Sequence, residues 1–297
     1  MDQLEDYRKA GKIAAHALEY GKALIKKDAS YLDVIKKIES KIKDSGGKFA
    51  FPPQISLNET AAHFLVENKE EDIIFNDELC CLDIGVEVNG AIGDNACTVD
   101  LSGQNAELVK ASEEALKSAI TAIEEGSLRL GTIGKTIQEA IESFGFKPVK
   151  NLSGHGLNIY NIHAPPTIPN FDTNDDIELE KDHVYAIEPF ATDGVGLIQE
   201  KGDPAIFMMT GRKSVRVGFV RQIQKMIDDM NGLPFTTRWI TGFSEAQIRY
   251  ALNQFKLLDI LKEFPPLVEK GSGLVSQAEK SLFIDSEGKV EILTKNS

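Results

Sequence analysis

Cysteine is scarce in this sequence of 297 residues, and long apolar runs are missing. The three cysteines are Cys80, Cys81 and Cys97, and no C-x-x-C pair occurs, so neither a disulfide framework nor a zinc–thiolate site is expected. We expect small, buried thiols in a reducing compartment. No run approaches roughly 18 apolar residues, the length of a membrane-spanning helix. The first residues lack the basic and apolar regions of a signal peptide, so the sequence predicts a cytoplasmic protein.

Basic residues are also in deficit. The chain has 33 Lys and Arg residues against 46 Asp and Glu residues, a formal net charge of −13, which argues against general binding to nucleic acid or to an anionic membrane. A hydrophobic content of 42% and a charged content of 27% exclude a disordered or fibrous chain. Tandem repeats, low-complexity tracts and clear linkers are absent from the sequence, so we expect one α+β domain over residues 1–297.

The periodicity of apolar residues predicts helices alternating with strands. Helices are expected at 2–26, 30–44, 105–125 and 132–144, and a short helix after Asn58 is expected to carry His63. Extended segments or strands are expected at 49–58, 82–88, 91–96, 149–152, 183–190, 274–279, 281–284 and 290–293, with a loop at 193–202. Residues 205–266 have mainly helical patterns, including a capping box of Ser244 and Gln247, and are interpreted as a helical insertion. The closing strands are expected to join the sheet of the hairpin.

That hairpin is predicted by residues 82–96. Asn89-Gly90 is the strongest short hairpin signal, because both turn positions need positive φ. With a two-residue loop, Asp83 lies opposite Ala96, and Asp94 lies two residues away on the same face, with Cβ atoms about 7 Å apart. Two carboxylates in that position would repel each other unless a positive charge lay between them. A pair of divalent metal ions would supply it; the alternative is that both acids are ordinary residues of the hairpin rim.

Three further residues are candidates for the same site. His155 lies between two glycines, Glu188 ends an apolar strand pattern, and Glu279 lies between two apolar runs. Taken singly, they also fit a loop histidine, a surface charge at a strand end and a salt bridge on an edge strand. Together with Asp83 and Asp94 they supply four carboxylates and one imidazole. This donor set suits Mn²⁺, Fe²⁺, Co²⁺ or Zn²⁺, and four negative charges balance two divalent cations but not one.

The chain resembles a methionine aminopeptidase of the second type, in peptidase family M24. The likeness is to the short, archaeal form without an N-terminal extension, and it covers nearly the whole length. The matching pieces are the stretch from Phe51-Pro52 through Leu57-Asn58 to Ala61-Ala62-His63, then Asp83-Ile84-Gly85-Val86, Gly93-Asp94, Gly154-His155-Gly156, Ile162-His163, 186–192, Leu233-Pro234-Phe235, Arg238-Trp239 and Gln277-Ala278-Glu279. The resemblance implies a single catalytic domain of the pita-bread fold, a curved antiparallel sheet with outer helices. It also implies that 205–266 is the helical insertion that separates the second type from the first.

The resemblance implies roles for ten residues and a cofactor of two divalent ions per chain, Co, Mn, Fe or Zn. Asp83 would bind one metal, His155 and Glu188 the other, and Asp94 and Glu279 would bridge the pair. Glu188 would also move a proton. The remaining five residues would contact the substrate: His63 and His163 at the scissile amide, and Phe51, Ile162 and Phe190 around the methionine side chain.

The implied activity is hydrolytic removal of N-terminal methionine from nascent proteins whose second residue is small. The implied partners are the N-termini of nascent polypeptides, with room for transient proximity to the ribosome; a monomer is expected, with no membrane and no nucleic acid. One departure from the family is Lys280, where a histidine is common, and its ammonium is expected either to pair with a ligand carboxylate or to point to solvent. Two alternatives stay open: an X-Pro dipeptidase, and a non-catalytic binding protein on the same scaffold.

Overall fold

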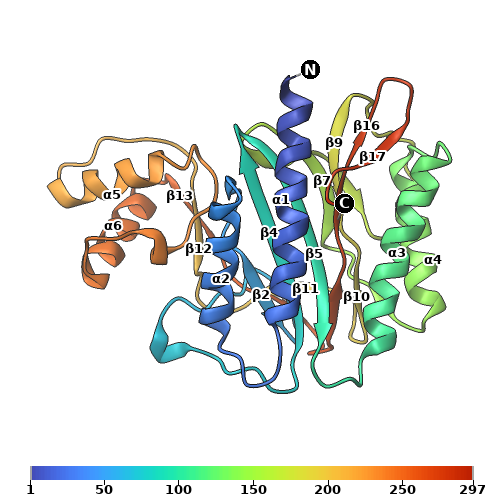
Figure 1. The fold of residues 1–297 in the computed structure, drawn as a ribbon, viewed down its shortest axis with the longest axis horizontal. Coiled ribbons are helices and arrows are strands. Elements are labelled where there is room, and N and C mark those ends of the chain that lie inside the picture. Colours follow the sequence, from blue (N-terminus) through green and yellow to red (C-terminus); the bar gives the residue numbers. More distant parts are fainter. Residues whose placement is uncertain (1, 296–297) are drawn as a thin grey trace.

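The computed structural model describes residues 2–295 and contains the predicted hairpin at its centre (Figure 1). Strands β4 (Leu79–Val88) and β5 (Ala91–Asp100) pair along their whole length, and the turn residues Asn89 and Gly90 have φ values of 51° and 89°. The predicted register is confirmed, because Asp83 is paired with Ala96. Strands β1 (Lys48–Phe49) and β2 (Gln54–Leu57) both pair with β4 on its other side.

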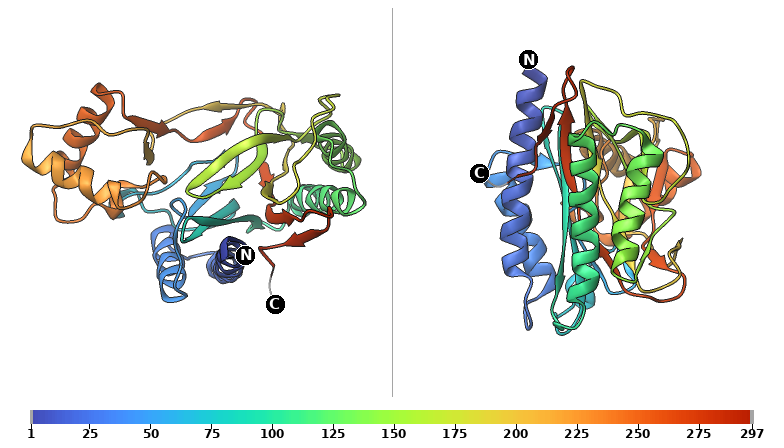
Figure 2. Two further views of the ribbon diagram at one scale, coloured as in Figure 1. Left: turned by 90° about the horizontal axis from the view of Figure 1, so that it is seen from above. Right: turned by 90° about the vertical axis from the view of Figure 1, so that its right-hand side faces the viewer.

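Two helices cover one face of this hairpin. Helix α1 (Asp2–Leu24) lies against β4 and β5, as both views in Figure 2 show, and helix α2 (Tyr31–Asp44) lies beside α1 and packs on β4. The approach is close: a Cβ added at Gly93 would lie 2.4 Å from the backbone nitrogen of Gly11, so β5 needs glycine where α1 crosses it. The opposite face of the hairpin, which carries Asp83 and Asp94, faces the rest of the chain.

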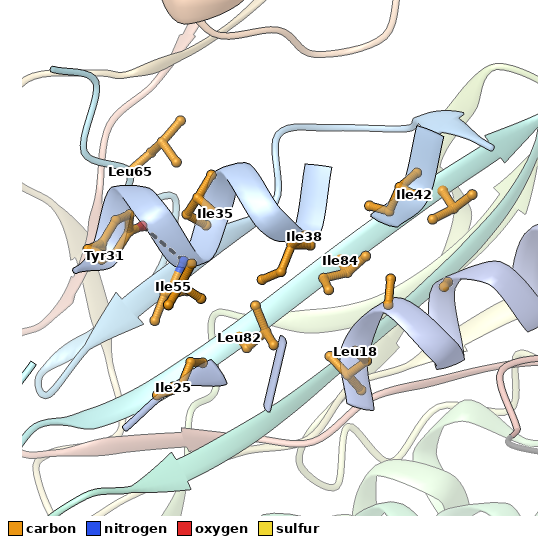
Figure 3. Packing of buried hydrophobic residues seen from close by; sticks show 14 of the residues in the cluster. Leu18, Ile25, Tyr31, Ile35, Ile38, Ile42, Ile55, Leu65, Leu82 and Ile84 are labelled. Carbon is orange, nitrogen blue, oxygen red and sulfur yellow. Dashed lines mark hydrogen bonds between the residues drawn. The ribbon is translucent and has the colours of Figure 1, made fainter. Parts of the chain in front are cut away.

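The core beneath α1 and α2 is apolar, with one polar tether (Figure 3). Ile35, Ile38 and Ile42 of α2 are fully buried, at the helical spacing that places them on one face. Tyr31 is also fully buried, and its hydroxyl accepts the N–H of Ile55 at 3.0 Å and donates to the carbonyl of Phe64 at 3.0 Å. Tyr31 therefore ties α2 to β2 and to the segment that follows His63.

The other half of the molecule contains a five-stranded antiparallel sheet in the order β17-β16-β9-β7-β8. Its strands are β7 (Ser153–Asn158), β8 (Asn161–Pro169), β9 (His183–Ile187), β16 (Lys280–Ile284) and β17 (Val290–Ile292). Helices α3 (Ala106–Glu124) and α4 (Leu130–Ser143) pack their apolar faces against this half (Figure 1). The two halves are joined where the N–H of Glu279 donates to the carbonyl of Ala96 at 3.0 Å.

Two small three-stranded sheets complete the framework. The first has the order β15-β10-β6, and the second has the order β11-β14-β3. Their strands are β6 (Lys147–Pro148), β10 (Phe190–Thr192), β15 (Val275–Gln277), β3 (Thr60–Ala62), β11 (Ile198–Glu200) and β14 (Leu267–Glu269). The segment between β3 and β4 contains the short helix η1 (Lys69–Glu71). Both sheets pair segments that are far apart in the sequence, and β14 in the second sheet pairs with the early strand β3.

Residues 205–266 have an apolar cluster of their own. The segment contains β12 (Ile206–Met209), α5 (Gly218–Asp228), η2 (Thr237–Trp239), α6 (Glu245–Leu257) and β13 (Leu261–Phe264). The predicted capping box is confirmed at the start of α6, where Ser244 and Gln247 cap each other's backbone. Helices α5 and α6 lie at the opposite end of the molecule from α3 and α4 (Figure 1). None of the helices in residues 2–295 has the length and apolarity that crossing a bilayer requires.

Several sequence expectations were wrong. His63 is not on a short helix: it follows strand β3 with a φ of 64°. Residues 149–152 are not a strand, and the pairing lies just before them in β6. The expected loop at 193–202 contains β11, and the helical segment 205–266 also contains the β12–β13 pair. The closing strands do not join the hairpin's sheet: β16 and β17 pair with β9, and β15 pairs with β10. Strand pairing between distant segments decides each of these points, and local periodicity does not report it.

Candidate metal centre and substrate cavity

The ten residues assigned from the sequence all line one cavity of about 350 Å³. They come from both halves of the fold: Phe51, His63, Asp83, Asp94, His155, Ile162, His163, Glu188, Phe190 and Glu279. The cavity lies on the face of the hairpin that α1 and α2 leave free. Strands β12 and β13 also border it, through Ile206 and residues 262–264.

Three of the five candidate ligands surround a single point. One ligand atom from each of Asp94, His155 and Glu279 lies within 4.8 Å of the other two, and all three residues are buried. Glu188 lies next to this group, and its Oε1 is 3.4 Å from His155 Nε2. Asp83 lies outside the triad, on β4, two positions from Gly85, the residue opposite Asp94.

The imidazole of His155 is held in the form that a metal ligand requires. Burial and, to a smaller extent, the neighbouring His163 lower the pKa of His155 to about 3, so the ring is neutral. Its Nδ1 lies 3.2 Å from the carbonyl of Gly156, where an Nδ1–H can donate. That tautomer leaves the Nε2 lone pair facing the carboxylates, the usual arrangement when a second bond orients a metal-binding histidine.

The four carboxylates are unfavourable as charged groups without a cation. Burial raises the pKa of Asp83 to about 7. Burial, followed by the charge of Asp83, raises the pKa of Asp94. Burial and then the other carboxylates do the same for Glu188 and Glu279. Like charges buried in one group are tolerated only with a compensating positive charge.

Two buried carboxylate oxygens, one on Asp83 and one on Asp94, are free to act as metal ligands. Asp83 Oδ1 and Asp94 Oδ1 are inaccessible and have no hydrogen-bond partner, although buried polar atoms in folded proteins nearly always have one. Hard oxygen donors with one neutral imidazole nitrogen match divalent first-row metals. The residues present therefore fit a divalent-metal site, and the unsatisfied oxygens mark where its ligands lie.

Two histidines flank the metal candidates without joining them. The His63 ring packs edge-on against Phe264 with centroids 5.4 Å apart, and its Nδ1 is buried without a partner. Burial lowers the pKa of His63 to about 4, so the ring is neutral. The His163 ring packs edge-on against His155 at 4.7 Å. Both residues line the cavity, and His63 Nδ1 has no hydrogen-bond partner within the described residues.

The apolar part of the cavity is formed by Phe51, Ile162 and Phe190, which are all buried. Phe51 lies directly over the hairpin: a Cβ added at Gly85 would lie 2.2 Å from its ring. Gly85 is paired with Asp94 on β5, so the absent side chain brings the aromatic ring next to the acidic group.

Sequence reasoning missed three residues that support the site. Gln54 donates to Asp83, and Gln277 Nε2 donates to Glu188 Oε2 at 3.4 Å. The Ser281 hydroxyl bonds to the backbone of Asp94. Gln54 and Gln277 lie inside the stretches that resemble the family, and this was the one signal that could have found them.

The ammonium of Lys280 neither pairs with a ligand carboxylate nor points to solvent, the two arrangements expected from the sequence. Its ammonium donates to the carbonyl of Thr294 at 2.7 Å, and the residue is absent from the cavity lining. Because successive side chains on a strand face opposite sides, Glu279 faces the cavity while Lys280 faces the other way. The lysine therefore fixes the chain beyond β17.

Comparison with known proteins agrees with this geometry. Methionine aminopeptidase from Archaeoglobus fulgidus is 39% identical over 287 residues, which cover 96% of each chain. Methionine aminopeptidase from Methanocaldococcus jannaschii is 38% identical over 297 residues, which cover 99% of this chain and 100% of that one.

Among solved structures, the chain is similar to methionine aminopeptidase from Thermotoga maritima. The TM-score is 0.72 at 24% identity, covering 99% of this chain and 97% of that one. Prolidase from Pyrococcus furiosus has a TM-score of 0.62 at 17% identity, covering 100% and 64%. These likenesses show the fold, which is the α+β pita-bread fold. The profile of metallopeptidase family M24 matches residues 5–221. The chain therefore belongs to metallopeptidase family M24.

Proposed function

We propose that this chain is a metal-dependent aminopeptidase that hydrolytically removes N-terminal methionine from nascent proteins whose second residue is small. The observation that carries the proposal is the convergence of four carboxylates, three imidazoles and an apolar wall on one cavity. The near full-length similarity to methionine aminopeptidases supports the same substrate.

The metal would be held as a pair of divalent ions, Co, Mn, Fe or Zn. Asp83 would hold one ion, His155 and Glu188 the other, and Asp94 and Glu279 would bridge them. The Asp94–His155–Glu279 triad supports this arrangement, because it places both bridging carboxylates beside the histidine. When bound, such a pair supplies a nucleophilic water at neutral pH and polarises the scissile carbonyl, as is known for aminopeptidases.

Glu188 is the residue best placed to hold a proton during the reaction. Its Oε2 accepts a bond from Gln277, and its Oε1 faces His155, so both oxygens have defined positions. Burial raises the pKa of this carboxyl, which favours proton uptake. His63 and His163 would contact the scissile amide from the other side, where a neutral imidazole N–H can stabilise developing negative charge.

Phe51, Ile162 and Phe190 would receive the methionine side chain. An unbranched thioether chain fills an apolar cavity of this kind closely, and a bulkier first residue would be excluded by overlap with the buried rings. Residues 205–266 would be the insertion of the second type of these enzymes, adding β12 and β13 to the cavity wall. We further propose a cytoplasmic monomer that acts on the N-termini of nascent polypeptides, with transient proximity to the ribosome.

Release of methionine from a Met-Ala-Ser peptide tests the proposal, with an Ala-Pro peptide as the competing substrate. We expect turnover of Met-Ala-Ser only, and bound divalent metal in protein purified without added metal. Preferential cleavage of Ala-Pro would instead support an X-Pro dipeptidase. A protein with neither turnover nor metal would be a binding protein on this scaffold.

A further inference from the structure

Gln54 spans the gap between a candidate metal ligand and a candidate substrate-contacting residue. It lies on β2, directly opposite Asp83 on β4, and is 5% exposed. Its Nε2 donates to Asp83 Oδ2 at 3.1 Å, and its Oε1 accepts the backbone N–H of His63 at 2.6 Å. One side-chain amide thus bonds to both the carboxylate of Asp83 and the backbone of His63.

The chemistry of the two partners fixes the orientation of this amide. A backbone N–H can only donate, so the Gln54 atom beside His63 is the oxygen. The amide nitrogen then faces Asp83, whose carboxylate accepts. The two bonds therefore depend on each other: a rotation of the amide that improves one of them weakens the other.

The bond to Asp83 leaves one carboxylate oxygen for a metal. Asp83 Oδ2 is occupied by Gln54, while Asp83 Oδ1 is buried without a partner. A bond of this kind to a ligand's second oxygen sets the rotation of the carboxylate and directs its free oxygen. Gln54 thereby determines which Asp83 atom is presented to the cavity.

The bond to His63 holds an unusual backbone conformation. His63 has a φ of 64°, in the left-handed region that residues with a Cβ rarely adopt. An anchored N–H at that position fixes the direction in which the ring leaves the chain. Without the anchor, we expect the backbone of His63 to relax and its ring to move away from the amide of a bound peptide.

We propose that Gln54 is a positioning residue that couples the Asp83 carboxylate to His63, so that metal binding and substrate alignment depend on one amide. This inference deepens the proposed aminopeptidase function and rests on it for the substrate side. The metal side stands independently of any activity, because it concerns only the affinity of the site for a divalent ion.

The test is Gln54→Met, which keeps the length of the side chain but removes both hydrogen bonds. Metal-free Gln54→Met protein is titrated with Mn²⁺ in a calorimeter. Its affinity for Mn²⁺ should be about 10-fold or more below that of the wild type, the usual effect of losing a residue that orients a metal ligand. At saturating Mn²⁺, kcat for Met-Ala-Ser should fall by about 10-fold or more, with KM changed by less than about threefold, because a misplaced His63 affects the transition state more than binding.

Ser56→Ala is the matched control. Ser56 is buried on the same strand, two residues from Gln54, and its hydroxyl has no hydrogen-bond partner. This control should keep wild-type Mn²⁺ affinity and kcat. A merely structural role for Gln54 would lower the melting temperature of Gln54→Met and leave Mn²⁺ affinity unchanged, and that result would overturn the inference.

Two further results also bear on the inference: a Gln54→Met variant that does not fold, and a wild-type protein that does not cleave the peptide. If Gln54→Met does not fold, Gln54→Asn takes its place: its amide is one methylene shorter and cannot span both partners, so wild-type affinity and kcat in that variant would refute the coupling. If the wild-type protein does not cleave Met-Ala-Ser, the proposed function fails, while a reduced Mn²⁺ affinity in the variant still supports the role of Gln54 toward Asp83.

Discussion

Ser281 binds both backbone polar groups of Asp94. Its hydroxyl accepts the Asp94 N–H at 2.9 Å and donates to the Asp94 carbonyl at 2.7 Å, and both residues are buried. Ser281 is on β16, whereas Asp94 is on β5, so one hydroxyl completes the hydrogen bonding of a hairpin residue from the neighbouring sheet. The position of a candidate bridging ligand therefore depends on contact between the two halves of the fold.

Ser281→Ala should destabilise the protein by about 2–4 kcal/mol, because it leaves a buried N–H and a buried carbonyl of Asp94 unpaired. Urea unfolding of the metal-free protein measures this loss. The matched control is Ser143→Ala: Ser143 is exposed, and its hydroxyl bonds only to a carbonyl of its own helix, so a change within about 0.5 kcal/mol is expected. Equal effects of the two substitutions would show that the Asp94 contact has no special weight.

Asp94→Asn should abolish turnover of Met-Ala-Ser and yet raise the melting temperature of the metal-free protein. The substitution keeps the shape of the side chain but removes a charge that burial and Asp83 make unfavourable. Thermal unfolding with and without a chelator measures the second effect. In the wild-type protein, chelation should lower the melting temperature, because it removes cations that compensate the charge of the clustered carboxylates. Near-full activity in Asp94→Asn would exclude Asp94 as a ligand.

Glu269 should contribute stability that depends on pH. Burial alone would raise its pKa, but the N–H groups of Gly273, Val195, Gly271 and Gly196 outweigh burial, and the pKa of Glu269 lies below its usual value. A depressed pKa in the folded state means that the contribution is present above the unfolded pKa, about 4.3, and is lost as pH falls through the folded value.

We therefore expect Glu269→Gln to lower the free energy of unfolding by about 2–3 kcal/mol at pH 7, since it weakens bonds to a charged acceptor. Urea unfolding at pH 7 and at about pH 3 should show the difference from wild type shrinking in acid. Glu114→Gln, at an exposed helix pair with Lys117, is the control and should change stability by less than about 0.5 kcal/mol at either pH. A constant difference for Glu269→Gln would contradict the pKa direction.

Arg238 and Glu39 should hold the 205–266 segment to α2. Two Arg238 nitrogens lie 2.8 and 3.3 Å from the Glu39 oxygens, the indole N–H of Trp239 donates to Glu39 at 3.0 Å, and both side chains of the ion pair are 11% exposed. Arg238→Ala leaves a buried carboxylate without its cation, so a loss of about 3–5 kcal/mol is expected.

Lys256→Ala breaks an exposed ion pair with Glu263 and should cost less than about 1 kcal/mol in the same unfolding experiment. Because β12 and β13 border the cavity, Arg238→Ala should also raise KM for Met-Ala-Ser. A loss no greater than that of Lys256→Ala would mean that the Arg238–Glu39 pair is not a structural anchor.

The hairpin shows how much local sequence can determine. The alternation in 82–88 and the Asn89-Gly90 turn together fix the pairing of Asp83 with Ala96, because a two-residue turn leaves one register. Helices α2 and α6 were equally accessible from the sequence, since their caps and apolar stripes lie within one stretch. In each case the deciding contacts join residues that are close in the chain.

The candidate site depends on contacts between residues that are far apart in the sequence. Residue type and context make His155, Glu188 and Glu279 candidates, but their separate ligand roles rest on the family resemblance, since spacing along the chain carries no information about distance in space. The sequence placed His63 on a helix, and the structure places it after a strand with positive φ, where Gln54 and β14 hold the segment. The direction of Lys280 was likewise decided by a carbonyl on the segment after β17.

The sequence by itself determined the hairpin, the outer helices and the inventory of candidate metal-binding side chains, because turn chemistry and apolar periodicity act over a few residues. The tertiary structure alone decided which sheet the closing strands join, how the carboxylates are oriented, and that Gln54 and Ser281 support them. Those outcomes depend on pairings between segments up to 187 residues apart, such as Ser281 with Asp94, and their energies exist only once the two halves have packed together.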